Sequence, residues 1–207
     1  TLNPSSAASD VYKRQNYYQP NLKIPEPFAK QVFNLDEITE INEESKKYVL
    51  NKIKDFNYGF FRPYDIGKKN IQFNFHGGAE WAGGSYDLNS EILYVTSSNI
   101  AWETGVEKLR KDNKFSSKPY YEYNSNFKRL KDQNGYPGSK PPWGKITALN
   151  LNNGKIIWQI PFGEYEELTK KNIPITGTFN YGGVTATAGD IIFATGTLDN
   201  KILSLIH

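Results

Sequence analysis

The chain has 207 residues, 38% of them hydrophobic and 23% charged, and its formal net charge is +3 at pH 7. Such a small surplus, from 25 basic and 22 acidic residues, argues against nucleic-acid binding. The absence of cysteine excludes a disulfide, a thiolate zinc site, a catalytic thiol and a C-x-x-C-H haem attachment within these residues.

The two ends of the chain read as translated sequencing adaptors. Residues 5–15 spell S-S-A-A-S-D-V-Y-K-R-Q, the translation of a transposon-end adaptor, and residues 203–207 spell L-S-L-I-H, from the opposite strand. Segments of this kind are set aside before fold reasoning. We therefore expect residues 1–15 and 203–207 to be artefacts on either side of an incomplete native segment, which also fits the absence of methionine.

Residues 16–70 are expected to form an irregular and partly helical excursion. Asn42, followed by two glutamates, is typical of a helix start. Four apolar residues behind it share a helical spacing: Tyr48, Val49, Ile53 and Phe56. The pattern predicts one short N-terminal helix at the surface.

From Phe73 onward the sequence predicts short strands separated by turns. The expected strands are 91–96, 145–151, 155–158, 185–187, 191–195 and 201–202. Asn152-Asn153-Gly154 between two of them is a hairpin signature. The stretch 110–142 is polar and rich in Tyr and Lys, so it is predicted as a long excursion outside the sheets. The spacing indicates an all-β protein, with radially repeated blades as one way to protect its sheet edges.

A blade repeat carries the first family resemblance. Residues 148–158, A-L-N-L-N-N-G-K-I-I-W, fit A-x-D-x-x-x-G-x-x-x-W with Asn150 in place of Asp. In this repeat the Ala fits between blades, the Gly permits the turn and the Trp docks on the neighbouring blade. The segment resembles the eight-bladed propellers of pyrroloquinoline quinone (PQQ) dependent dehydrogenases, although cofactor-free propellers share the repeat.

Flanking motifs narrow the resemblance to the membrane glucose dehydrogenase-like branch of that family. They are F-H-G-G-A-E-W-A-G-G (75–84), L-Y-V-T-S-S-N-I-A-W (93–102), D-Q-N-G-Y-P (132–137), P-P-W-G (141–144), P-F-G-E-Y (161–165) and T-G-T-F-N-Y-G-G (176–183). The resemblance implies that residues 71–202 form a partial arc of about three blades of an eight-bladed β-propeller.

The same resemblance implies a quinoprotein that oxidises an alcohol or an aldose such as glucose. PQQ would accept the hydride, and calcium would polarise the quinone carbonyl of PQQ. A membrane quinone or a cytochrome would then receive the electrons. Such enzymes work in the periplasm, in some cases attached to the membrane. Their catalytic base and metal ligands lie in earlier blades, so we expect no catalytic and no metal-binding residue in this chain, and no activity from it alone.

A few residues can be assigned to the cofactor by resemblance. Asn99 matches an amide that hydrogen-bonds the cofactor's polar edge, although a one-residue offset would move this role to Ser98. Tyr181 matches a cofactor-facing aromatic residue, and Gly182 after it permits close approach of backbone to a ligand or simply a tight turn. Glu80 and Trp81 are candidates for the substrate funnel, with blade packing as the alternative.

Two further expectations concern the whole fold. A cofactor-free propeller that serves as a protein-binding scaffold is the alternative function, because fold alone does not determine function. Since each blade buries its apolar face on its neighbours, residues 16–202 expressed alone are expected to aggregate or to stay partly unfolded.

Overall fold

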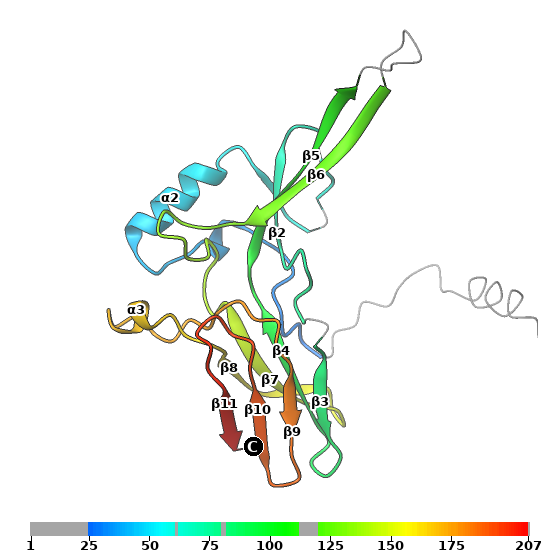
Figure 1. The fold of residues 1–207 in the computed structure, drawn as a ribbon, viewed down its shortest axis with the longest axis vertical. Coiled ribbons are helices and arrows are strands. Elements are labelled where there is room, and N and C mark those ends of the chain that lie inside the picture. The colour runs from blue at the N-terminus through cyan, green and yellow to red at the C-terminus, as the bar shows by residue number, and fades with distance from the viewer. Residues whose placement is uncertain (1–24, 61, 80–81, 112–119, 207) are drawn as a thin grey trace, which may run out of the picture.

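The computed structural model describes residues 25–60, 62–79, 82–111 and 120–206, which are mostly strands in three sheets (Figure 1). The helical elements are η1 (Leu35–Glu37), α2 (Glu43–Ile53) and α3 (Glu166–Thr169). The strands are β1 (Asn57–Tyr58), β2 (Lys69–Phe73), β3 (Gly84–Asp87), β4 (Ile92–Ser98), β5 (Ala101–Lys111), β6 (Tyr120–Arg129), β7 (Gly144–Asn150), β8 (Lys155–Pro161), β9 (Val184–Ala186), β10 (Ile191–Ala194) and β11 (Leu203–Ile206). No helix among the described residues is long and apolar enough to cross a membrane.

The sheets have the antiparallel pattern of propeller blades. One is a four-stranded antiparallel sheet in the order β3-β4-β7-β8, and a second, three-stranded sheet has the order β11-β10-β9. The third, β1-β2-β5-β6, is antiparallel except for the short parallel pair β1 and β2. The predicted all-β class is confirmed.

The blade repeat has the structure that its sequence predicts. β7 and β8 pair across a turn in which Gly154 adopts a φ of 67°. Ala148 is fully buried and lies opposite Trp158, which packs on the apolar cluster between this sheet and β9–β10. A small residue at this position lets the two sheets approach each other closely.

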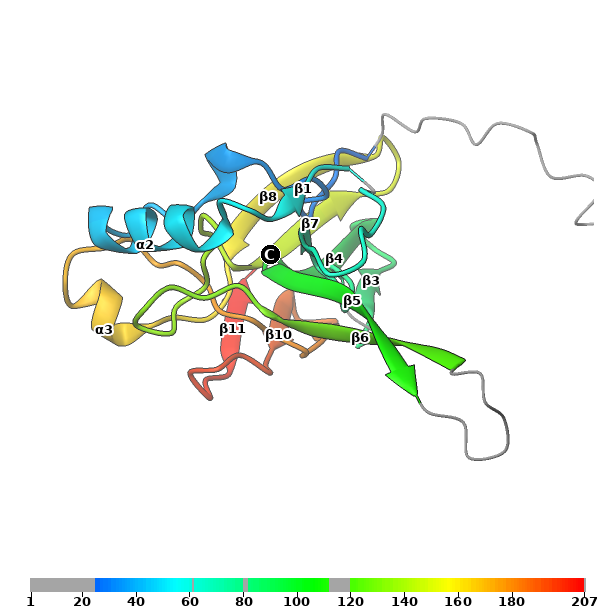
Figure 2. The same cartoon turned by 90° about the horizontal axis from the view of Figure 1, so that it is seen from above.

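Helix α2 begins where the sequence predicts. The Asn42 side chain accepts a hydrogen bond from the backbone N–H of Ser45, and so caps the helix. Val49 and Ile53 are buried against Phe33, Ile71 and other apolar residues beside the sheet β1-β2-β5-β6. The opposite side of the helix is exposed to solvent. Figure 2 shows α2 at the edge of the molecule.

The structure differs from the prediction in several strands. β1, β2, β3 and β5 were not among the predicted strands, and β1 and the start of β2 lie in the stretch 16–70 that was predicted to be irregular or helical. Within 110–142, the segment Tyr120–Arg129 pairs with β5 along ten residues, so this part of the predicted excursion belongs to a sheet. The periodicity was hidden because neither face of the hairpin is consistently apolar. The outer half of the hairpin projects from the body (Figure 1). The last strand forms at Leu203–Ile206, later than the predicted 201–202 and on residues assigned to the adaptor.

Four glycines bring backbone segments into direct contact, and we call them the glycine seam: Gly144, Gly177, Gly182 and Gly196. A Cβ on Gly144 would meet the Thr178 carbonyl oxygen, and one on Gly177 would meet Gly144 itself. A Cβ on Gly182 would overlap the Thr195 carbonyl oxygen. Only residues without a side chain allow these approaches.

Candidate functional site

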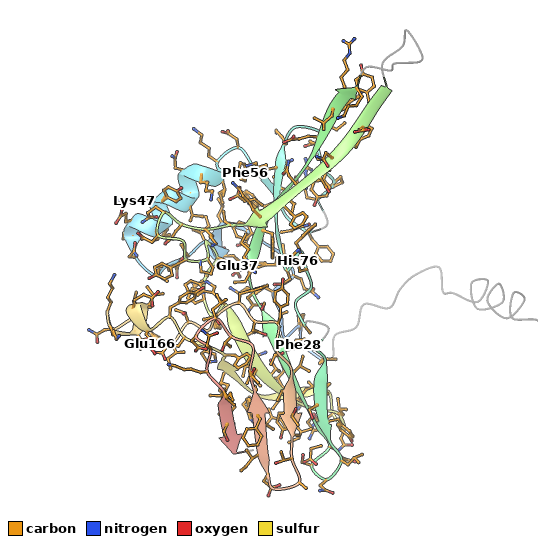
Figure 3. All side chains as sticks on the ribbon, viewed as in Figure 1. Phe28, Glu37, Lys47, Phe56, His76 and Glu166 are labelled. Atoms are coloured by element: carbon orange, nitrogen blue, oxygen red, sulfur yellow. The ribbon has the colours of Figure 1, made fainter. Side chains whose placement is uncertain are left out.

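A group of aromatic side chains lies where the three sheets meet, and its members come from four separate segments. We call it the aromatic patch; it consists of Phe75, His76, Trp102, Phe127, Phe179 and Tyr181. Figure 3 shows His76 in the middle of the molecule, between the sheet with the projecting hairpin and the two other sheets. Trp102 and Phe179 are buried at 4% exposure, whereas Phe127 and Tyr181 are half-exposed. The patch therefore presents partly exposed aromatic rings on a packed base.

Tyr181 is the predicted site residue that the structure places in this patch. Its ring meets that of Phe179 edge-on, with centroids 4.4 Å apart. Its hydroxyl oxygen lies 2.9 Å from Nδ1 of His76, so the two side chains are hydrogen-bonded. His76 in turn packs on Trp102 at 4.3 Å between centroids. The ring of Tyr181 is thus fixed at both ends while 42% of the residue stays exposed.

Arg129 gives the patch a positive charge. Its guanidinium carbon lies 3.7 Å from the centroid of Phe179 and 5.6 Å from that of Trp102. Such stacking holds a guanidinium in place and leaves its in-plane N–H groups available to an anion. Among the described residues, no carboxylate is within ion-pair distance of Arg129. A flat, anionic ligand suits these residues.

The structure places Asn99 away from this surface. The residue is fully buried; its Oδ1 accepts from the backbone N–H of Lys30 at 2.8 Å, and its Nδ2 donates to the Pro142 carbonyl at 3.1 Å. Asn99 therefore joins the N-terminal segment to the loop before β7. Its predicted hydrogen bond to a cofactor stays a prediction.

Ser98, unlike Asn99, contacts the segment that bears Tyr181. Its hydroxyl lies 3.3 Å from both the backbone carbonyl oxygen and the backbone nitrogen of Asn180. Ser98 is the last residue of β4 and Asn99 follows the strand, and their side chains bond to different segments. The sequence left open whether Asn99 or Ser98 bonds to the cofactor. In the structure, the Asn99 side chain is buried against the N-terminal segment, and the Ser98 hydroxyl contacts Asn180.

Gly182 is required by the fold for a reason that involves no ligand. It lies against Thr195 and Gly196 with no room for a Cβ, and its carbonyl accepts a hydrogen bond of 2.6 Å from the Thr96 hydroxyl. Its predicted role beside the cofactor stays a prediction. Glu80 and Trp81 lie outside the described residues.

Sequence reasoning missed Arg129, Phe75 and Phe127. Arg129 and Phe127 belong to the polar stretch that was predicted to lie outside the sheets, where nothing marks them as neighbours of Trp102. Trp102 itself is buried and forms part of the core. Among the described residues, no group of three or more His, Asp and Glu side chains is arranged to hold a metal ion.

Comparison with known proteins identifies the family. The profile of the PQQ family, described as the β-propeller domain of glucose, ethanol and alcohol dehydrogenases, matches residues 6–205. The chain belongs to the PQQ β-propeller family. This agrees with the blade repeat, with the antiparallel sheets and with the recognition made from the sequence motifs.

Curated relatives of this PQQ-family chain are dehydrogenases. It is 26% identical to the glycerol dehydrogenase large subunit of Gluconobacter oxydans, over 90% of this chain and 28% of that protein. It is 23% identical to the quinate/shikimate dehydrogenase (quinone) of Acinetobacter baylyi, over 59% of this chain and 18% of the relative. It is 30% identical to the quinoprotein glucose dehydrogenase of Escherichia coli, over 33% of this chain and 9% of that protein. The chain spans about 28% of the length of the first of these relatives.

Proposed function

We propose that the whole protein is a periplasmic quinoprotein dehydrogenase that oxidises an alcohol or an aldose. PQQ would accept the hydride, and a membrane quinone or a cytochrome would receive the electrons. The observation that carries the proposal is the aromatic patch with Arg129, found in a chain of the PQQ family. PQQ is a flat molecule with several carboxylates, so it suits an aromatic surface beside a guanidinium that pairs with no carboxylate of the described residues.

Each residue of the patch has a distinct part in this proposal. Tyr181 would give the cofactor a flat surface, and the hydrogen bond to His76 would keep its ring in one orientation. Arg129 would bind a carboxylate, with the buried Trp102 and Phe179 beneath it as support. When bound, PQQ supplies the two-electron redox chemistry, and the protein supplies orientation and charge. Calcium and the general base would be held by residues outside this chain.

Activity of the whole protein is the first test. The purified protein is incubated with PQQ and calcium, and reduction of an artificial dye is followed with glucose, glycerol and quinate as substrates. Turnover of any alcohol or aldose supports the proposal. If none is oxidised while PQQ binds, the dehydrogenase function is wrong; if PQQ does not bind, the cofactor assignment is wrong as well.

A binding experiment tests the patch itself. PQQ binding to the whole protein is measured through quenching of tryptophan fluorescence. Because a charge-assisted hydrogen bond contributes about 1.5–3 kcal/mol, Arg129→Gln is expected to raise the Kd for PQQ about tenfold or more. Arg110→Gln, on the same hairpin but in its exposed outer part, is the matched control and should change the Kd by less than about twofold. Equal effects of both substitutions would contradict the assignment of Arg129.

A further inference from the structure

An open cavity lies between the segment that precedes α2 and the segment that follows α3. Its volume is about 480 Å³, which is in the range of pockets that hold small organic ligands. Figures 1 and 2 show α2 and α3 on the same side of the molecule. We call this cavity the proline pocket; its apolar lining consists mainly of Ile41, Pro141, Pro142, Ile173, Pro174 and Ile175.

The proline pocket carries an ion pair at its mouth. The Lys140 ammonium lies 2.7 Å from a carboxylate oxygen of Glu40, and both partly exposed side chains line the pocket. The Thr176 hydroxyl, which also lines it, donates to the Gly177 carbonyl. An ammonium group has three N–H donors, so Lys140 can keep its ion pair and donate to a ligand oxygen as well. The pocket therefore suits an uncharged, largely apolar molecule that has an acceptor oxygen.

The proline pocket contacts the apolar cluster beneath the aromatic patch. Ile41 is a buried member of the cluster that contains Trp102 and Phe179, and Ile173 packs against that cluster. Thr176 of the pocket precedes Phe179 of the patch by three residues, so their Cα atoms are at most about 11 Å apart. The pocket and the patch are therefore close neighbours that share one packed support.

We propose that the proline pocket binds the ring and the first part of the isoprenoid tail of a membrane quinone. The inference rests on the proposed function, in which a quinone receives the electrons. In the overall step, two electrons and two protons leave reduced PQQ and are taken up by the quinone, which becomes a quinol. The apolar tail matches the prolines and isoleucines of the lining. The Lys140 ammonium donates a hydrogen bond to one carbonyl oxygen of the ring.

A quinone fits this pocket better than PQQ or a cytochrome does. PQQ carries several carboxylates, and burial of these charges against prolines and isoleucines is unfavourable. A cytochrome is a protein and needs a contact surface of about 800 Å² on each partner, whereas the feature here is a concave pocket of ligand size. A quinone combines an uncharged ring, two acceptor oxygens and an apolar tail.

Binding of a short-chain quinone to the whole protein tests the site. The probe is ubiquinone-1, measured by equilibrium dialysis without PQQ and without an oxidisable substrate, so the result does not depend on turnover. Ile175 is 52% exposed, and Ile175→Glu places a carboxylate in the apolar lining. We expect this variant to raise the Kd for ubiquinone-1 about tenfold or more.

Ile66→Glu is the matched control, because Ile66 is 57% exposed and is not among the residues that line the proline pocket. It makes the same change in charge and should alter the Kd by less than about twofold. Lys140→Gln tests the polar end and should raise the Kd about threefold or more, because the charged donor is lost. Circular dichroism of each variant ensures that only folded protein is compared.

Three results would overturn the proposal. The first is undetectable binding of ubiquinone-1 by the wild type, and the second is an equal loss of binding in Ile175→Glu and Ile66→Glu. The third is displacement of ubiquinone-1 by PQQ, which would place the quinone on the aromatic patch instead. A failure of the proposed dehydrogenase function is distinguishable from these, because it appears as absence of dye reduction and not as a change in quinone binding.

Discussion

At the scale of single residues, Gly182 shows how closely the backbone segments of this chain approach each other. A methyl group at this position would overlap the Thr195 carbonyl oxygen, which is backbone and cannot rotate away. The Thr96 hydroxyl also bonds to the Gly182 carbonyl, so a shift of this segment would break a second contact. The position therefore resists even the smallest side chain.

We predict that Gly182→Ala lowers the free energy of unfolding of the whole protein by about 3 kcal/mol, because the inserted methyl forces two backbone segments apart. Gly189→Ala is the matched control, since a Cβ there meets nothing within 4 Å. Its effect should stay within about 0.5 kcal/mol or be slightly stabilising. Urea denaturation measures both, and equal effects would contradict the packing argument.

Tyr165 gives a prediction for alkaline pH. Burial raises the pKa of its phenol from 10.0 to about 12, where its ring packs on Trp143 and Tyr136. The folded state therefore holds the phenolic proton more tightly than the unfolded state. The associated stability is complete below pH 10 and is lost as the pH rises from 10 to 12, by up to about 2 kcal/mol.

Because phenylalanine has no proton to lose, Tyr165→Phe should reduce the loss of stability between pH 10 and 12 relative to wild type. Denaturation at a series of pH values measures this difference. Parallel profiles for wild type and Tyr165→Phe would show that the prediction is wrong.

At the scale of elements, Glu103 holds the base of the hairpin. Its side chain on β5 is 1% exposed, and three lysines surround it: Lys52 of α2 at 2.8 Å, with Lys69 of β2 and Lys128 of β6 both at 3.5 Å. One carboxylate thus links a helix and two strands to a third strand. Its removal leaves three cations close together without a counter-charge.

Glu103→Ala is therefore expected to destabilise the protein by about 1–2 kcal/mol, because the carboxylate is buried while its three lysines are partly exposed to solvent. Glu107→Ala, on the same strand and face but exposed, is the control and should cost less than about 0.5 kcal/mol. Thermal unfolding of the two variants distinguishes them. If Glu103→Ala lowers the stability no more than Glu107→Ala does, the ion pairs between Glu103 and the three lysines do not stabilise the fold.

Elements with a clean pattern were predictable from the sequence. Asn42 predicts the start of α2, and Asn152-Asn153-Gly154 predicts the turn between β7 and β8. β6 was missed because both of its faces carry polar residues, with aromatic residues among them. A strand is recognised from its sequence when one face is apolar and the other is polar. The aromatic patch was missed for a related reason. Its members lie far apart in the sequence, and only the pairing of β5 with β6 brings Phe127 and Arg129 to Trp102.

At the scale of the whole molecule, the sheets have open edges. β8 and β11 are each hydrogen-bonded to a single neighbouring strand among the described residues. Apolar side chains such as Ile157 and Phe193 are about half-exposed on these sheets. In a closed propeller, neighbouring blades would cover such surfaces.

We therefore expect the chain expressed by itself to aggregate or to bind the dye ANS strongly, since its sheet faces and edges remain uncovered. Size-exclusion chromatography with light scattering measures the first property, and dye fluorescence the second. A monodisperse monomer with a single cooperative melting transition would contradict this expectation.

The glycine seam has a consequence for sequence divergence. Where two sheets meet through side chains, each substitution changes their spacing a little, and the interface drifts as a family diverges. At Gly144 and Gly177 the spacing between β7 and the segment before β9 is set by backbone atoms, which no substitution alters in size. Gly182 and Gly196 fix in the same way the spacing of the two chain segments that continue β9 and β10 of one sheet. The sheets should thus keep their relative positions while the surrounding residues change freely. In a saturation mutagenesis library of the chain, we expect nearly every substitution at these four glycines to impair folding. Most substitutions at the neighbouring positions should be tolerated.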